Sequence, residues 1–82
     1  MSKLHVDILL LLRAAGPYGL ALDALLDDLR ERRHRDLTLP QLERAARDLA
    51  DKSFAEPFTS PLGKKRWRIA PLGETALSQE AL

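Results

Sequence analysis

The apolar positions of this chain follow a helical period in residues 1–52 and an alternating period from residue 54 onwards. The helical period predicts a first helix over about residues 3–15, with Ser2 as N-cap and Gly16-Pro17 as the stop signal. One face of this helix is apolar, as a core helix requires, through Leu4, Ile8, Leu11, Leu12 and Ala15. Its other side also carries apolar residues, namely Val6, Leu9 and Leu10. Because a helix that is apolar on both sides is usually covered twice, a second subunit is one candidate for the second cover.

Two more helices are predicted before the period changes. A stub of strand over residues 19–22 precedes the second helix, which spans about residues 23–33 with Asp23 as its cap or first-turn acid. The third helix spans about residues 38–52, where Thr38 and Gln41 form a capping box and Pro40 fits the first turn. The inward stripes are Leu22, Leu25, Leu26 and Leu29 in the second helix, and Leu39, Leu42, Ala46 and Leu49 in the third.

The alternating period predicts a two-stranded hairpin over about residues 54–70 and a short last helix over about residues 71–80. The first strand is an edge strand because it contains Pro57, and residues 60–63 supply the turn. Phe54 and Phe58 can share one face of the first strand. Trp67 and Ile69 can share one face of the second strand, whereas Arg66 and Arg68 point the other way. The last helix starts at Pro71 and is expected to offer to the core Leu72, Ala76 and Leu77.

Length and composition restrict the class of protein. The chain has 82 residues, of which 45% are hydrophobic and 30% charged, so residues 1–82 are expected to form one globular domain with a small core. It contains no cysteine, which excludes a disulfide framework and makes a cytoplasmic location the default expectation. The apolar run from Ile8 to Leu12 is too short to span a membrane and lacks the cleavage site of a signal peptide.

The net charge of +1 hides an uneven distribution of charge along the chain. Residues 1–29 carry two basic and four acidic side chains, and residues 71–82 carry two acidic ones. Residues 30–52 carry seven basic and five acidic side chains, and residues 53–70 carry four basic and one acidic. The basic excess therefore lies between the end of the second helix and the end of the hairpin.

The predicted order of helix, strand stub, helix, turn, helix, hairpin and helix is that of a winged helix-turn-helix domain. The chain resembles this family at Thr38-Leu39-Pro40-Gln41-Leu42, at Asp51-Lys52-Ser53-Phe54 and at Arg66-Trp67-Arg68-Ile69-Ala70-Pro71-Leu72-Gly73. The last segment is similar to the aromatic-basic-aliphatic-Thr-Pro-x-Gly segment of bacterial winged-helix regulators, with Ala70 in place of Thr, and Ser53 stands where Gly is usual. The resemblance covers nearly the whole chain. It implies a mostly helical α+β fold with a three-helix core, a C-terminal two-stranded wing and a short last helix.

The resemblance also implies that the protein binds double-stranded DNA as a small bacterial or phage-type transcriptional regulator. In that family the third helix enters the major groove, and the wing contacts a minor groove or phosphates. On this chain the outward face of the third helix would offer to base edges Gln41, Arg44 and Arg47. The cations expected at the phosphate backbone are Lys64, Lys65, Arg66 and Arg68 in the hairpin, and Arg33 and Arg35 in the turn before the third helix.

Some of these assignments have a purely structural alternative. Arg44 and Arg47 are each followed four residues later by an aspartate, Asp48 and Asp51, and such pairs can simply support a solvated helix by about 0.2–0.5 kcal/mol each. The hairpin cations have no acid nearby in sequence, which favours phosphate contact over a solvated surface. Trp67 is expected to anchor the hairpin to the core rather than to stack on a base.

Neither catalysis nor a metal, a cofactor or a small-molecule ligand is expected. The chain has no cysteine nucleophile and no Gly-rich phosphate loop, and neither His5 nor His34 has a partner at catalytic or metal-ligand spacing. The alternative to DNA binding is a winged helix that binds another protein, which the acidic face of the second helix and the low net charge support. Both hypotheses admit a homodimer through the apolar residues of the first and last helices, namely Val6, Leu9, Leu10, Ala76, Leu77, Ala81 and Leu82.

Overall fold

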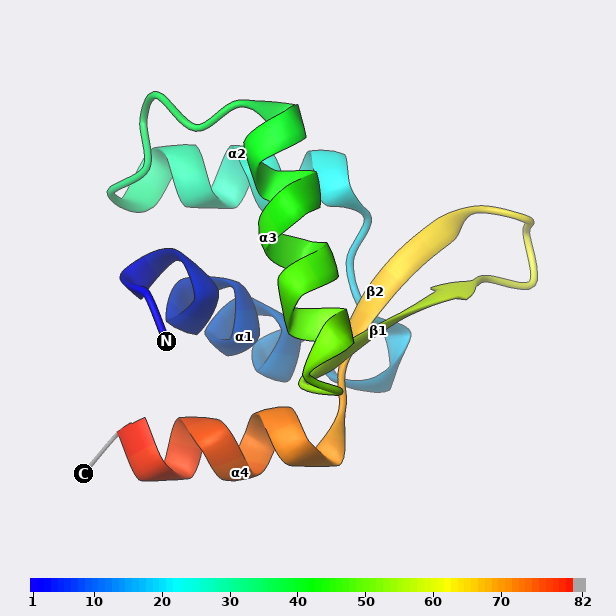
Figure 1. Cartoon of the computed structure of the whole chain (residues 1–82). Helices are drawn as coiled ribbons and strands as arrows, with labels where there is room; N and C mark the ends of the chain where they lie inside the picture. Colours follow the sequence, from blue (N-terminus) through cyan, green and yellow to red (C-terminus); the bar gives the residue numbers. More distant parts are fainter. Residues whose placement is uncertain (81–82) are drawn as a thin grey trace.

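The structure, a computed structural model, describes residues 1–80 of the chain as four α-helices and a two-stranded antiparallel sheet (Figure 1). The elements follow in the order α1 (Lys3–Ala15), a short 3-10 helix η1 (Gly16–Tyr18), α2 (Leu22–Arg32), α3 (Leu39–Asp51), β1 (Ala55–Thr59), β2 (Lys65–Ile69) and α4 (Pro71–Glu80). Each helix and the hairpin lie within one residue of the bounds predicted from the sequence. The mostly helical α+β class is confirmed for the described residues.

Side-chain caps determine where α1 and α3 begin. The backbone N–H of His5 donates to Ser2 Oγ at 3.2 Å, which makes Ser2 the N-cap of α1 as predicted. At α3 the N–H of Gln41 donates to Thr38 Oγ1 at 3.3 Å, and the N–H of Thr38 donates to Gln41 Oε1 at 3.0 Å. The predicted capping box is therefore formed and satisfies two backbone donors at the start of the helix.

The end of α3 is a Schellman motif that directs the chain into β1. The N–H of Phe54 donates to Leu49 O at 2.9 Å, and the N–H of Ser53 donates to Ala50 O at 3.0 Å. Ser53 has φ +61°, the left-handed conformation that glycine adopts most easily, and it is the one non-glycine residue with positive φ among residues 1–80. Ser53 thus occupies a glycine-type position at the cost of some backbone strain.

The hairpin pairs β1 with β2 in register from Ala55 opposite Ile69 to Thr59 opposite Lys65. Gly63, at φ +81°, closes the turn, and its N–H donates to Ser60 O at 2.8 Å. On the other edge of β2, Leu20 and Trp67 exchange two backbone hydrogen bonds of 2.8 Å each. The predicted strand stub is thus a single bridge at Leu20, and β2 lies between it and the edge strand β1.

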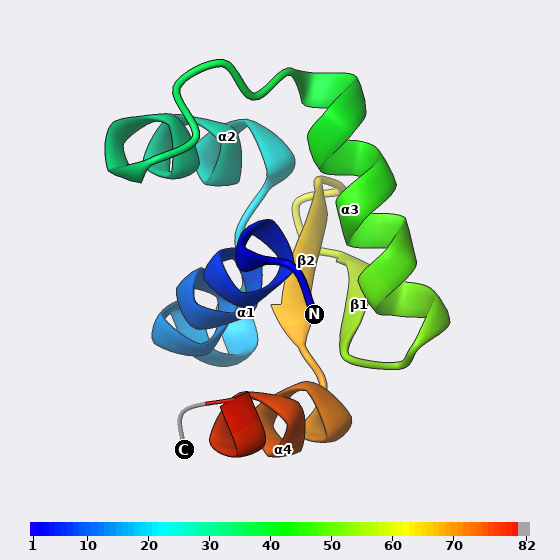
Figure 2. The same cartoon turned by 60° about the vertical axis from the view of Figure 1, so that its left-hand side comes forward.

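The core is built mainly from leucines of the first three helices together with Trp67 and Leu77. Figures 1 and 2 show α4 lying along α1, against which it packs. Leu9, on the side of α1 for which a second subunit was one candidate cover, is fully buried within the chain itself. Val6 and Leu10 are half-buried beside it. Leu9 is thus buried by residues of its own chain and needs no second subunit.

Two leucines assigned to the core from their spacing are exposed. Leu39 is 40% exposed, because it stands at the first position of α3, and Leu37 in the preceding loop is buried in its place. Leu72 is 55% exposed, because α4 turns Gly73 and Leu77 toward the core instead. A Cβ atom on Gly73 would lie 2.1 Å from the carbonyl oxygen of Phe54, so the close approach of α4 to the end of α3 requires glycine.

None of the helices within residues 1–80 combines the length and the apolar character needed to cross a membrane.

Candidate functional site

The turn of the hairpin carries two unpaired cations. Lys64 and Lys65 are exposed, and neither forms an ion pair with any carboxylate of residues 1–80. Three hydrogen bonds hold the turn that presents them: Gly63 N–H to Ser60 O, Ser60 N–H to Lys64 O, and Lys64 N–H to Ser60 Oγ at 3.2 Å. Figure 1 shows the hairpin projecting from one side of the helical body. The two ammonium groups are therefore available to an anionic partner.

The other two cations of the hairpin make contacts within the chain. Arg66 donates from Nη1 to the carbonyl oxygen of Tyr18 at 3.2 Å. Arg68 Nε lies 2.7 Å from Glu56 Oε1 on the neighbouring strand, and its guanidinium lies 4.5 Å from the ring centre of Phe58. The expectation that no acid neutralises the hairpin cations is therefore wrong for Arg68. The strand register, which places Glu56 opposite Arg68, is the signal that would have found this pair.

Trp67 belongs to the core, as expected. Its side chain is 4% exposed and packs in the main hydrophobic cluster, and its backbone forms the bridge to Leu20. Lys65 Nζ lies 5.8 Å from the centre of the indole ring. The buried indole N–H has no hydrogen-bond partner among residues 1–80. A ring buried to this degree does not stack on a nucleobase unless the inner end of the hairpin unfolds.

The outward face of α3 carries two arginines without ion pairs. Arg44 and Arg47 are exposed, and neither pairs with Asp48 or Asp51 although each aspartate lies one helical turn further along. The intrahelical pairs that the spacing allows are therefore not formed. Asp48 Oδ2 instead lies 3.6 Å from His5 Nε2 at the start of α1. Within the described part of the chain, no carboxylate therefore occupies the guanidinium groups of Arg44 and Arg47.

Gln41, the third residue expected to contact bases, already has a structural role. Its Oε1 atom accepts the N–H of Thr38 in the capping box, so the amide NH₂ group and one remaining lone pair of Oε1 are available to another molecule. Gln41 shares one open groove with Arg35 and Leu37 of the α2–α3 loop, and a second with Leu4 and His5 of α1. It therefore lies between the loop and the start of α1.

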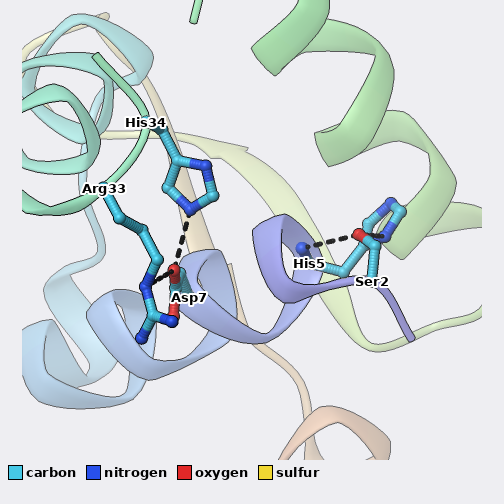
Figure 3. A network of polar contacts seen from close by, with 5 residues as sticks. All are labelled: Ser2, His5, Asp7, Arg33 and His34. Carbon is cyan, nitrogen blue, oxygen red and sulfur yellow. Dashed lines mark hydrogen bonds and ion pairs between the residues drawn. The ribbon is translucent and has the colours of Figure 1, made fainter.

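The α2–α3 loop is tied to α1 through a buried carboxylate (Figure 3). Asp7 is 6% exposed, and its Oδ2 atom accepts a 2.8 Å hydrogen bond from His34 Nε2 and lies 3.3 Å from Arg33 Nε. A buried carboxylate is costly unless it is paired, so both loop residues stabilise the fold. The positive charge of Arg33 is thus largely compensated inside the molecule.

Sequence reasoning missed this cluster, although one signal for it was present. Asp7 lies three residues after Leu4 and four before Leu11, within the apolar face of the first helix. An acid at such a position needs a partner, and the sequence alone does not say which cation supplies it. Arg35, by contrast, is exposed and forms no ion pair within residues 1–80.

A cleft of about 330 Å³ lies between α1 and α4. Val6, Leu10 and Leu77 form its apolar wall, and Met1, whose amino group lies 3.5 Å from Glu80 Oε1, stands at its rim. This is the surface expected to form a homodimer. Of the residues named for that surface, Ala81 and Leu82 lie outside the described part of the chain.

Residues 1–80 hold no group of three or more His, Cys, Asp or Glu side chains arranged to bind a metal ion. Comparisons with protein-family models, with curated proteins and with solved structures found no match to this chain. The proposals for its function therefore rest on the residues and their geometry.

Proposed function

We propose that this chain is a winged-helix DNA-binding domain of a transcriptional regulator, with α3 in the major groove and the hairpin as a wing on the phosphate backbone. The observation that carries the proposal is the pair of exposed lysines, Lys64 and Lys65, on a turn held by three hydrogen bonds and without any acidic partner in residues 1–80. Such cations fit phosphate oxygens, which position a protein on DNA without selecting a sequence.

The arrangement of the elements supports the same proposal. The bridge at Leu20 extends the sheet on the far side of β2 from β1, so the hairpin is attached to the segment between η1 and α2. The capping box and the Schellman motif give α3 defined ends, and its outward arginines Arg44 and Arg47 form no ion pair with a carboxylate of residues 1–80. Arginine suits bidentate contact with the O6 and N7 atoms of guanine, so we assign base reading to these two residues.

The test is a titration of the protein into a fluorescent mixed-sequence duplex at several salt concentrations. Binding through phosphates predicts that log K falls linearly with log salt, with a slope of about −0.9 for each phosphate neutralised. Replacement of both hairpin lysines (K64A/K65A) should weaken binding and make the slope about 1.8 less steep. No binding of the wild type at low salt, or binding that ignores salt, would contradict the proposal.

A charge-matched control uses two cations of α1. Lys3 and Arg13 are exposed and line the α1–α4 cleft, and neither belongs to the hairpin turn. The variant K3A/R13A removes the same amount of charge as K64A/K65A, so it reports the effect of net charge alone. It should retain most of the affinity and the slope of the wild type. Equal losses of DNA affinity in the two variants would indicate that only the net charge of the protein attracts DNA.

The second candidate function, binding of another protein, is favoured by the acidic outer face of α2. Asp23, Asp27 and Glu31 are exposed on this helix and form no ion pair within residues 1–80. Under this alternative K64A/K65A leaves the binding of the partner unchanged. The homodimer through α1 and α4 is compatible with either function, and a monomeric mass by light scattering at high protein concentration would exclude it.

A further inference from the structure

The turn of the hairpin exposes an apolar side chain that does nothing for the fold. Leu62 is 87% exposed, more than any other large hydrophobic residue among residues 1–80. It is absent from the core cluster and from the partly buried residues that pack against that cluster. The side chain is therefore accessible to a partner outside the chain.

The backbone around Leu62 is held in place, which fixes the direction of the side chain. Pro61 precedes Leu62, and its ring fixes its own φ. Gly63 follows Leu62 in the left-handed region at φ +81°. The hydrogen bonds of Ser60 with Gly63 and Lys64 close the turn on both sides. Little backbone entropy is therefore lost when this side chain enters a binding site.

The electrostatic surroundings of Leu62 indicate an anionic partner. Lys64 and Lys65 follow Leu62 after a single residue, Gly63, and the nearest acid along either strand is Glu56, which already pairs with Arg68. Glu56 stands three register positions beyond the Thr59–Lys65 pair, a distance of about 10 Å at the rise of an extended strand. An apolar tip beside two free cations suits a polyanion that also offers an apolar surface, which describes the base stack of DNA between its two rows of phosphates.

We propose that Leu62 is an apolar wedge that the hairpin turn inserts at a base step in the DNA minor groove, with Lys64 and Lys65 on the flanking phosphates. The proposal rests on the DNA-binding function proposed above. Apolar wedges of this kind partly unstack one base step and kink the duplex by roughly 20–90° toward the major groove. The cost of the kink depends on the sequence at that step, since pyrimidine–purine steps such as TpA unstack easily whereas A-tracts are stiff.

This dependence yields a test with two polymers of identical composition and charge density. Alternating poly(dA-dT) contains a TpA step in every repeat, and poly(dA)·poly(dT) contains none. Replacement of the wedge (Leu62→Ala) should weaken binding to the alternating polymer by about tenfold and change binding to the homopolymer little. Leu62→Met, which keeps an apolar side chain, should retain the preference of the wild type for the alternating polymer.

Two further variants separate the wedge from the phosphate contacts. K64A/K65A should lower affinity for both polymers together and reduce the dependence on salt. Leu72→Ala, which removes the other strongly exposed leucine from α4, should change neither affinity. Circular dichroism spectra identical to that of the wild type establish that each variant is folded. Energy transfer between dyes at the ends of a short duplex with one central TpA step should rise with wild-type protein and not with Leu62→Ala.

The two proposals fail in different ways. If wild-type protein binds neither polymer, the proposed DNA-binding function is wrong and the wedge with it. If the wild type binds DNA and Leu62→Ala binds each polymer as tightly as the wild type does, the wedge is wrong and the DNA-binding function stands. An equal loss of affinity on both polymers also overturns the wedge, because it shows no dependence on the deformability of the step. A leucine that docks on another protein gives the second of these outcomes.

Discussion

The hairpin turn and the α2–α3 loop are both basic in sequence, yet their cations differ in what they contact. Lys64 and Lys65 form no ion pair with residues 1–80, whereas Arg33 pairs with the buried carboxylate of Asp7, which also accepts a hydrogen bond from His34. Figure 1 shows the two segments on opposite sides of the helical body. The first set of charges is directed outward, and the second stabilises the packing of the loop on α1.

This difference shows that a run of basic residues has no fixed function. Arg33 and Lys65 carry the same charge, but the charge of Arg33 is balanced by an acid that is 6% exposed. Replacing a loop residue should therefore change stability, and replacing a hairpin residue should change binding. The predictions that follow test this division, from the largest expected effect to the smallest.

The largest effect is expected for His34→Ala. This substitution leaves the buried Asp7 carboxylate without its 2.8 Å hydrogen bond and with Arg33 as its one ion-pair partner in residues 1–80. The free energy of unfolding should fall by about 2 kcal/mol, measured by urea denaturation. Arg35→Ala, one residue further along the same loop, is the matched control and should change it by less than about 0.5 kcal/mol. Equal effects of the two substitutions would contradict the role given to Asp7.

A comparable but more selective effect is expected for Arg44→Ala and Arg47→Ala on α3. If these side chains read bases, each replacement should cost about 1–3 kcal/mol on duplexes selected from a random pool and much less on unselected duplexes. The hairpin variant K64A/K65A should weaken both classes alike. Equal losses on selected and unselected duplexes would reassign the two arginines to phosphate contact, with the same role as the hairpin lysines.

Next in size is a gain in stability at the junction of α3 and β1. Ser53→Gly removes the strain of a non-glycine residue at φ +61° but increases the freedom of the unfolded chain. The net result should be a stabilisation of about 0.5–1 kcal/mol by urea denaturation, without change in DNA affinity. A change in affinity would show that the hairpin's orientation, and not only its charge, limits binding.

The smallest effect is expected for Glu56→Gln. The pair that Glu56 forms with Arg68 is solvent-exposed, so its loss should alter the free energy of unfolding by less than about 0.5 kcal/mol. Affinity for duplex DNA at low salt should rise slightly, because Arg68 becomes free and one negative charge leaves the hairpin. A fall in affinity would mean that the pair positions the hairpin for binding.

Local signals in the sequence predicted the elements well. The capping box at Thr38, the stop at Gly16-Pro17 and the change of period at residue 54 each depend on neighbouring residues only. Leu39 and Leu72, which were wrongly assigned to the core, are the first and second residues of their helices. Helical periodicity does not determine burial there, because no helical turn precedes these positions. Boundaries could therefore be predicted more reliably than the burial of terminal positions.

The partners of the charged side chains could not be predicted in the same way. His34 and Asp7 are 27 residues apart, so their contact follows from no helical or strand period. The contact of Arg68 with Glu56, 12 residues away, follows only once the register of the hairpin is known. The intrahelical pairs of α3, which the period does allow, are not formed, because helical spacing permits a pair without requiring it. Which cations are free is thus a property of the tertiary structure.

The central claim is that the hairpin cations, and not those tied to Asp7, neutralise DNA phosphates. It is tested by the salt dependence of duplex binding for two variants that each lose one positive charge, Lys65→Ala and Arg33→Ala, at a temperature where circular dichroism shows both to be folded. The slope of log K against log salt should become about 0.9 less steep for Lys65→Ala and stay at the wild-type value for Arg33→Ala. A slope that changes for Arg33→Ala and not for Lys65→Ala would contradict the account.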